Sequence, residues 1–116
     1  MQYRKFDLEE RLIDFGVMII ESSEKLPKTN AGRHLADQLL RSGTAPALLY
    51  GEVQAAESKK DFVHKMKIAL KELRETSINL RMLQKTRLLS EDTVLGECKQ
   101  LVAIFQKSID TVLQNS

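Results

Sequence analysis

The chain has 116 residues and a formal net charge of +2, with 29% charged residues, 5% aromatic residues and no tryptophan. This length is enough for one hydrophobic core but short for two ordinary domains, and the scarcity of aromatic and turn-forming residues favours helices over strands. No basic segment followed by a long apolar run is present, so we expect neither a secretion signal nor a membrane span, and we expect a cytoplasmic location.

The first predicted helix covers about residues 8–26. Asp7 is its predicted N-cap, with Glu10 three residues later, and Pro27 ends the pattern. Its apolar residues recur at steps of four, three and four, as on one face of a helix: Leu8, Leu12, Phe15 and Ile19.

The second predicted helix covers about residues 31–57, with Asn30 as its predicted cap. Its middle contains Pro46, which removes one backbone hydrogen bond and crowds the carbonyl of Ser42 four residues earlier. Helical spacing nevertheless continues through the apolar and small residues on both sides of the proline: Leu35, Leu39, Leu40, Gly43, Ala47 and Tyr50. The pattern therefore predicts one helix that is kinked near residue 46, and not a loop between two helices.

The third predicted helix covers residues 59–85, and Ser58 with Asp61 resembles an N-terminal capping box. An apolar seam runs along it in alternating steps of four and three: Phe62, Met66, Ala69, Leu73, Thr76, Leu80 and Leu83. Such heptad spacing is typical of left-handed helical bundles. Ile68 and Ile78 lie off the seam, which leaves apolar surface for contacts with another chain.

The fourth predicted helix covers about residues 91–114, with Ser90 as its predicted cap. Its seam consists of Leu95, Cys98, Val102, Phe105, Ile109 and Val112. Cys98 is the one cysteine, so it cannot form an internal disulfide, and its place in the seam predicts a small buried apolar residue. With short connections between consecutive helices, residues 1–116 are predicted to form a single all-α domain, an antiparallel up-down four-helix bundle with a proline-kinked second helix.

Positive charge is concentrated in residues 58–87, which hold nine Lys or Arg against three acids, whereas each flanking part of the chain has a net charge of −2. Seven basic or histidine residues, here called the basic stripe, share one face of the third helix: Lys60, His64, Lys67, Lys71, Arg74, Arg81 and Lys85. The stripe would extend about 38 Å and lie roughly 140° around the helix from the seam. It predicts contact with a nucleic-acid backbone, and the alternative is a solvated charged face.

Catalytic and metal-binding interpretations find little support in the residues. Asp61 and His64 form a single carboxylate–histidine pair, whereas a di-iron bundle needs two such pairs and two further glutamates, so Asp61 is better explained as a capping residue. Lysines, not arginine, precede His64, which argues against a helical ribonuclease of the Arg–His type. Phosphate-binding glycine loops and nucleophile elbows are absent. We expect a protein without enzymatic activity, metal, cofactor or small-molecule substrate.

Residues 41–83 resemble the signature region of the four-helix-bundle proteins that are encoded in intervening sequences of bacterial 23S rRNA genes. The matching residues are Arg41, Ser42, Gly43, Glu52, Ser58, Lys60, Asp61, Phe62, Lys67, Ala69, Glu72 or Arg74, Glu75 and Thr76. The resemblance implies a bundle that assembles into a homo-oligomeric ring, usually a pentamer, without established enzymatic activity. The accessory protein of diversity-generating retroelements has a similar fold, and it binds a reverse transcriptase and nucleic acid.

Two hypotheses for function follow from the residues and the resemblance. The first is an RNA-binding or RNA-linked scaffold that acts through the basic stripe, with RNA or a nucleic-acid enzyme as its partner. The alternative is a protein–protein assembly module that makes no contact with nucleic acid. In either case, a set of structural or interface residues is predicted to shape the bend and the subunit contacts, with its charged members in a buried or interfacial ion network: Arg41, Gly43, Pro46, Glu52 and Glu75.

Overall fold

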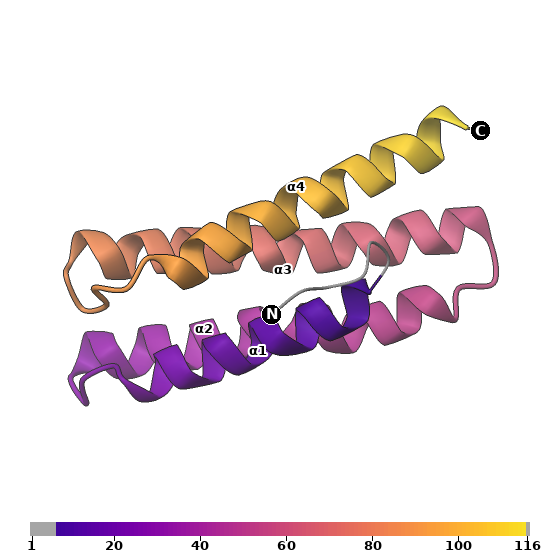
Figure 1. The fold of residues 1–116 in the computed structure, drawn as a ribbon. Helices are drawn as coiled ribbons and strands as arrows, with labels where there is room; N and C mark the ends of the chain where they lie inside the picture. Colours follow the sequence, from indigo (N-terminus) through magenta and orange to yellow (C-terminus); the bar gives the residue numbers. More distant parts are fainter. Residues whose placement is uncertain (1–6, 116) are drawn as a thin grey trace.

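The computed structural model describes residues 7–115, which form four α-helices and no strands. The helices are α1 (Leu8–Glu24), α2 (Asn30–Gln54), α3 (Lys59–Lys85) and α4 (Thr93–Gln114). Figure 1 shows them lying side by side as a bundle, with short connections at its two ends. The all-α class and the four-helix bundle predicted from the sequence are therefore confirmed.

Consecutive helices make most of the tertiary contacts, because α2 packs between α1 and α3, and α3 packs against α4. Asn79 contacts Leu35, and Thr76 contacts Ser42, so the residue order along α3 is reversed relative to α2. Figure 1 shows the same reversal of chain direction at each connection. The remaining contact between helices, that of α1 with α4, is the least extensive of the four.

An ion pair between Arg11 and Glu97, here called the clasp, joins α1 to α4. Arg11 donates two hydrogen bonds of 2.8 Å to the carboxylate of Glu97 and a third of 2.8 Å to the Gln100 side chain. Both ionised side chains are about four-fifths buried. Nearer the connection that precedes α4, Lys25 pairs with Glu91 at 3.3 Å in a more exposed position.

Two predicted helix caps are confirmed and two are wrong. The side chains of Asp7 and Ser58 accept hydrogen bonds from the third residue of α1 and of α3. At α2 the cap is Thr29, whose hydroxyl accepts from the Gly32 amide; it precedes Asn30, and either residue type suits this position. The fourth helix begins only at Thr93, so the predicted cap at Ser90 lies outside it.

The end of α3 is a Schellman motif built without glycine. Arg87 has a φ of 60°, and its amide donates to the Gln84 carbonyl. The Leu88 amide donates to the Leu83 carbonyl, so two carbonyls of the last turn have partners. A residue other than glycine costs about 1–2 kcal/mol in this left-handed conformation, so the motif forms despite a steric penalty at Arg87.

The core contains the predicted seams almost entirely. The largest side chains with 2% exposure or less come from all four helices: Leu12, Phe15, Ile19, Leu39, Val53, Met66, Leu73, Leu80, Leu83, Leu101, Phe105 and Ile109. Each such burial contributes about 1.5–3 kcal/mol relative to an exposed side chain. Leu40 is a wrong prediction, because it lies one residue beyond Leu39 on the helix and is 41% exposed.

The segment around Pro46 is part of one continuous helix, because α2 runs without interruption from Asn30 to Gln54. A loop at this place is thereby excluded, whereas the predicted kink stays a prediction. The hydroxyl of Thr44 donates to the Leu40 carbonyl at 2.7 Å. Gly43 lies directly against Ile19 of α1, where a Cβ atom would come within 2.6–2.9 Å of three side-chain atoms. Glycine at this position therefore permits the close approach of α1 and α2.

Candidate nucleic-acid interface

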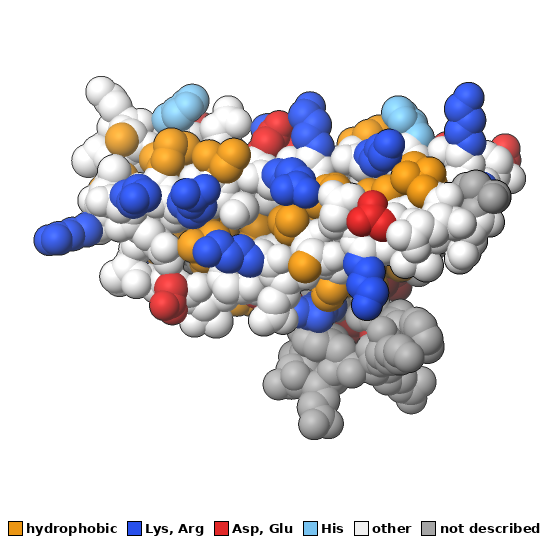
Figure 2. Space-filling model, turned by 90° about the horizontal axis from the view of Figure 1, so that it is seen from above, with side chains coloured by type: hydrophobic (Ala, Val, Ile, Leu, Met, Phe, Trp, Pro, Cys, Tyr) orange, Lys and Arg blue, Asp and Glu red, His pale blue; other side chains and the backbone are white. Residues whose placement is uncertain are grey.

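All seven residues of the basic stripe are exposed on the outer side of α3. The seam residues of the same helix are buried or half-buried, so the predicted separation of charge from core is present. Figure 2 views the molecule from above, over α3 and α4, and shows Lys and Arg side chains spread along this face with hydrophobic side chains between them. The helix thus presents a charged surface about as long as itself.

The stripe differs along its length in how much of its charge is neutralised. Lys71 lies 4.0 Å from Glu75, and Lys65 beside the stripe pairs with Asp61 at 3.1 Å. The Lys65 contact is the main reason that the pKa of Asp61 is lowered. Within residues 7–115, no ion pair involves the other Lys and Arg residues of the stripe: Lys60, Lys67, Arg74, Arg81 and Lys85.

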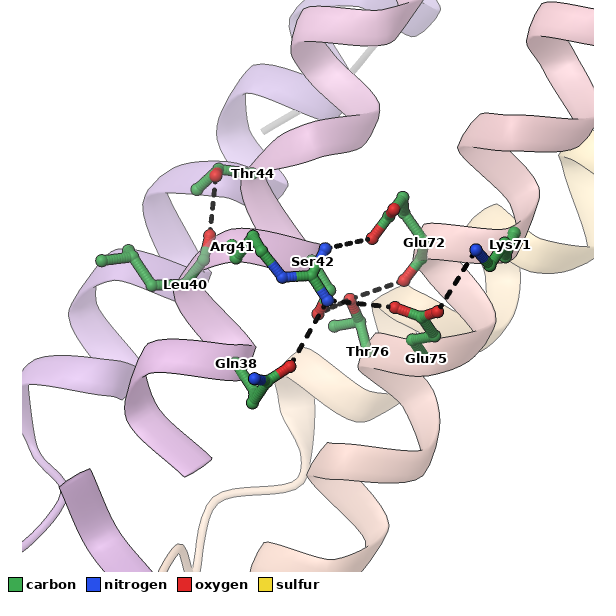
Figure 3. Close-up of polar contacts among 9 residues, drawn as sticks. All are labelled: Gln38, Leu40, Arg41, Ser42, Thr44, Lys71, Glu72, Glu75 and Thr76. Atoms are coloured by element: carbon green, nitrogen blue, oxygen red, sulfur yellow. Dashed lines mark hydrogen bonds and ion pairs between the residues drawn. The ribbon is translucent and has the colours of Figure 1, made fainter. Parts of the chain in front are cut away.

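Arg41 of α2 forms a cluster with two acids of α3 (Figure 3). Its guanidinium lies 3.2 Å from Glu72 and 3.3 Å from Glu75, and it also donates to the Gln38 side chain. The hydrogen bond to Glu75, together with the charge of Glu72, raises the pKa of Arg41. Because the Arg41 side chain is 56% exposed, the network lies at the surface of the bundle and not in its core. The other form of the prediction, a network at an interface between chains, stays a prediction.

The other predicted structural residues lie apart from this cluster. Glu52 is exposed near the end of α2, about 16 Å further along the helix axis than Arg41, so it does not join the two acids of α3. Gly43 and Pro46 are buried in α2. The predicted set therefore consists of one ion cluster, one buried helix contact and one separate surface carboxylate.

Beneath the cluster, buried polar groups connect α2 to α3. The hydroxyls of Ser42 and Thr76 lie 2.8 Å apart, and Thr76 lies 2.8 Å from the Glu72 carbonyl oxygen (Figure 3). Since a carbonyl only accepts, Thr76 donates to it, which leaves Ser42 to donate to Thr76. One turn further on, the Asn79 amide donates to the Leu35 carbonyl at 3.1 Å, while its buried oxygen has no partner among residues 7–115.

The opposite side of α3 faces α4 through a different kind of contact. Cys98 is fully buried, and its thiol lies 3.3 Å from the Leu73 carbonyl oxygen. Burial raises the pKa of this thiol to about 12, with a smaller contribution from the charge of Glu97. A thiol in this state is a small apolar core residue, as the sequence predicted, and not a reactive nucleophile.

A basic groove lies above this apolar contact and includes one functional candidate that sequence reasoning missed. The groove has a volume of about 310 Å³, and α3 and α4 both line it: Arg74, Ser77, Ile78, Arg81, Lys99 and Val102. Lys99 belongs to α4, so the spacing of the stripe on α3 could not reveal it. Its sequence signal was weak, because it is one of two basic residues in an acidic segment.

Residues 7–115 contain no group of three or more His, Cys, Asp or Glu side chains placed to hold a metal ion. No described helix combines the length and apolar character needed to cross a bilayer. With its packed core and charged outer faces, the fold defines the class of small four-helix bundles.

Within that class, similarity to known proteins identifies the family of this chain. The chain belongs to the family described as 23S rRNA-intervening sequence proteins, whose model matches residues 4–110. A crystal structure from Bacteroides thetaiotaomicron, described as a protein of unknown function from the S23 ribosomal protein family, is 26% identical, with a TM-score of 0.81 over 87% of this chain and 96% of that chain. No curated protein matches the chain.

Proposed function

We propose that this protein is a non-enzymatic, oligomeric helical bundle that binds nucleic acid, namely RNA, through the basic face of α3. The observation that carries the proposal is the exposed basic stripe, on a segment of the chain (residues 58–87) whose net charge is +6, whereas the whole chain has a net charge of +2. The description of the family names 23S rRNA, and that of the solved relative names a ribosomal protein family; we take both as support for RNA as the polyanion.

The chemistry of the stripe favours contact with phosphates over contact with bases. Its members are lysines, arginines and one histidine, and no aromatic side chain stands among them for stacking on bases. Lysine and arginine neutralise phosphates and release condensed counterions, irrespective of the base sequence. Binding should therefore be largely independent of sequence and steeply dependent on salt.

Oligomerisation is supported by exposed apolar residues that the monomer does not cover. On α1, Ile13, Val17 and Ile20 follow one another at steps of four and three residues and are each 44–48% exposed. Ile68 of α3, predicted to lie off the seam, is 37% exposed, whereas Ile78, which is 55% exposed, lines the α3–α4 groove described above. Apolar stripes of this kind are typical of contacts between chains. We expect a homo-oligomer, with a pentameric ring as the form implied by the resemblance, in the cytoplasm.

The test is the salt dependence of binding to duplex RNA. With about five phosphate contacts, the logarithm of the association constant should fall with the logarithm of salt at a slope of roughly −4 to −5. The variant K67Q/K71Q/R74Q/K85Q should flatten that slope by about three to four units. A control variant with the same loss of charge outside the stripe, K25Q/K28Q/R33Q/K107Q, should retain most of it.

Light scattering and circular dichroism on the same samples show whether fold and assembly are intact. We expect a mass several times 13.2 kDa for the wild type and for both variants. Binding that responds neither to salt nor to the stripe substitutions would overturn the nucleic-acid proposal. An oligomer without RNA binding would instead favour the alternative function, a protein–protein assembly module, which the apolar stripe of α1 supports.

A further inference from the structure

The groove between α3 and α4 gathers cations from two helices. Arg74 and Arg81 lie seven residues apart on one face of α3, with Ser77 and Ile78 between them, and Lys99 reaches the groove from α4. The Arg74 guanidinium donates to the Gln106 side chain of α4 at 3.0 Å, which ties it to the facing helix. Arginine side chains from one helix and a lysine from its neighbour therefore surround one hollow.

These three cations lack a neutralising acid within the described part of the chain. None of them takes part in an ion pair there, and no carboxylate lines the groove. The next groove along the surface, between α2 and α3, contrasts with this one, because its arginine, Arg41, is paired with Glu75. Uncompensated positive charge in a concave surface attracts anions more strongly than the same charge on a convex surface.

The dimensions of the groove suit consecutive phosphates. Arg74 and Arg81 are separated by two helical turns, or about 10.5 Å along the axis. Phosphates of one strand are spaced about 3.4 Å apart along a duplex axis, so the two arginines span about three of them. Lys99 lines the same groove from α4, which places it within reach of such a run, and Ser77 offers a hydroxyl donor there.

We infer that the α3–α4 groove binds a short run of backbone phosphates, with Lys99 completing a site that the arginines of α3 begin. The apolar side chains of Ile78 and Val102 form part of its lining, which suits the sugar edges between phosphates. This inference deepens the proposed function and depends on it, because it assigns the contacts to one groove and adds a residue outside the stripe.

The test compares the two lysines of α4, because they differ in position and not in charge. Lys99 lines the groove, whereas Lys107 is exposed further along the helix and lines a different hollow that also contains Asp110. The probes are a 20-nucleotide oligouridylate and a 20-base-pair RNA duplex, titrated between 0.1 and 1 M salt. K99Q should weaken binding about five- to eightfold at 0.1 M salt and flatten the slope by about 0.7 to 0.9, while K107Q should leave both unchanged.

Each outcome decides a separate point. If the wild type binds neither probe, the proposed function itself fails. If the wild type binds and the stripe variant loses binding, but K99Q and K107Q behave alike, the groove is overturned while the stripe stands. The charge-reversal pair K99E and K107E repeats the comparison with a larger expected difference. Both lysines are exposed, and circular dichroism confirms that each variant is folded.

Discussion

The two sides of α3 differ in the polarity of their buried contacts and in whether their surface charges are paired. On the side facing α2, the buried contact is polar, with two hydroxyls and an asparagine, and the surface above it neutralises itself through Arg41, Glu72 and Glu75. On the side facing α4, the buried contact is apolar around Cys98, and the surface above it carries unpaired cations. The comparison shows that the paired and the unpaired charges of α3 are separated according to the neighbouring helix that they face.

The separation has a simple origin in the order of residues. Glu72 and Glu75 are the last acids of α3, and Arg41 of α2 meets them halfway along the helix. The part of α3 that follows holds Arg81 and Lys85 without any acid, and the next acid in the chain is Glu91. The part of α3 after Glu75 therefore carries positive charge without any acid, whereas the lysines of the part before it are interspersed with acids.

The largest expected effect comes from breaking the polar contact on the α2 side. T76V keeps the shape of the side chain but strands the buried hydroxyl of Ser42, which is 2% exposed. We expect the free energy of unfolding to fall by about 1–3 kcal/mol, the usual cost of leaving one buried polar group without a partner. Urea denaturation followed by circular dichroism measures this change.

The double variant S42A/T76V is the control for that experiment. It removes both hydroxyls, so no polar group is stranded, and it should be less destabilised than the sum of the two single variants. Additive losses, or a T76V variant as stable as the wild type, would mean that the hydroxyl pair contributes little to this side of α3.

A smaller effect is expected on the α4 side, where the thiol responds to alkaline pH. The pKa of Cys98 is raised from 9.0 to about 12 in the folded protein. The buried neutral thiol contributes to the free energy of unfolding fully below pH 9. This contribution is lost between pH 9 and pH 12, because only the thiol of the unfolded chain ionises in that range. Raising the pH from 8 to 10 should therefore cost the wild type about 1.4 kcal/mol more than it costs C98A.

Comparing the two proteins at each pH removes the titration of lysines and tyrosines, which they share. The measurement is again urea denaturation, at pH 8 and pH 10 in the same salt. If wild type and C98A lose the same free energy of unfolding between pH 8 and pH 10, the thiol is accessible to solvent in the folded state. The α4 side of α3 would then not have the apolar buried contact on which the comparison depends.

The smallest expected effect tests whether acids keep the α2 side from binding polyanions. E72Q/E75Q frees Arg41 and Lys71 from their carboxylate partners. We expect RNA affinity at 0.1 M salt to rise about fivefold and the salt slope to steepen by about one unit. The matched controls are E52Q, an exposed glutamate on α2 away from the cluster, and the pair E21Q/E24Q, exposed on α1. A similar gain in E21Q/E24Q would show that only the net charge matters.

Much of the fold could be predicted because the seams of α3 and α4 repeat without interruption. Regular apolar spacing reports which face is buried, so Leu73 and Phe105 were correctly placed in the core. The residues that begin and end individual helices were harder to predict. Thr29 and Asn30 are both favoured cap residues, and Asn ranks above Thr, so residue type alone pointed to the wrong one of the two. Nothing about Arg87 distinguishes it as the residue that adopts a positive φ.

The site was predictable only where it lies on one helix. The stripe follows from spacing along α3, and all of its members are exposed. Lys99 could not be found in this way, because its place beside Arg74 and Arg81 depends on the register between α3 and α4. Glu52 shows the converse, since a shared sequence signature grouped it with Arg41, although the two are exposed at different levels of α2.

The order in which the helices contact one another has a consequence for how the chain folds. Among residues 7–115, nearly all contacts between helices join helices that are consecutive in the sequence, and the contact between α1 and α4 is the exception. Low contact order of this kind is typical of proteins that fold in microseconds to milliseconds. The hairpins α1–α2, α2–α3 and α3–α4 each close a short loop, whereas the clasp of Arg11 on Glu97 needs the whole chain. We therefore expect the clasp to form after the other helix contacts, and we expect the folded bundle to open there first.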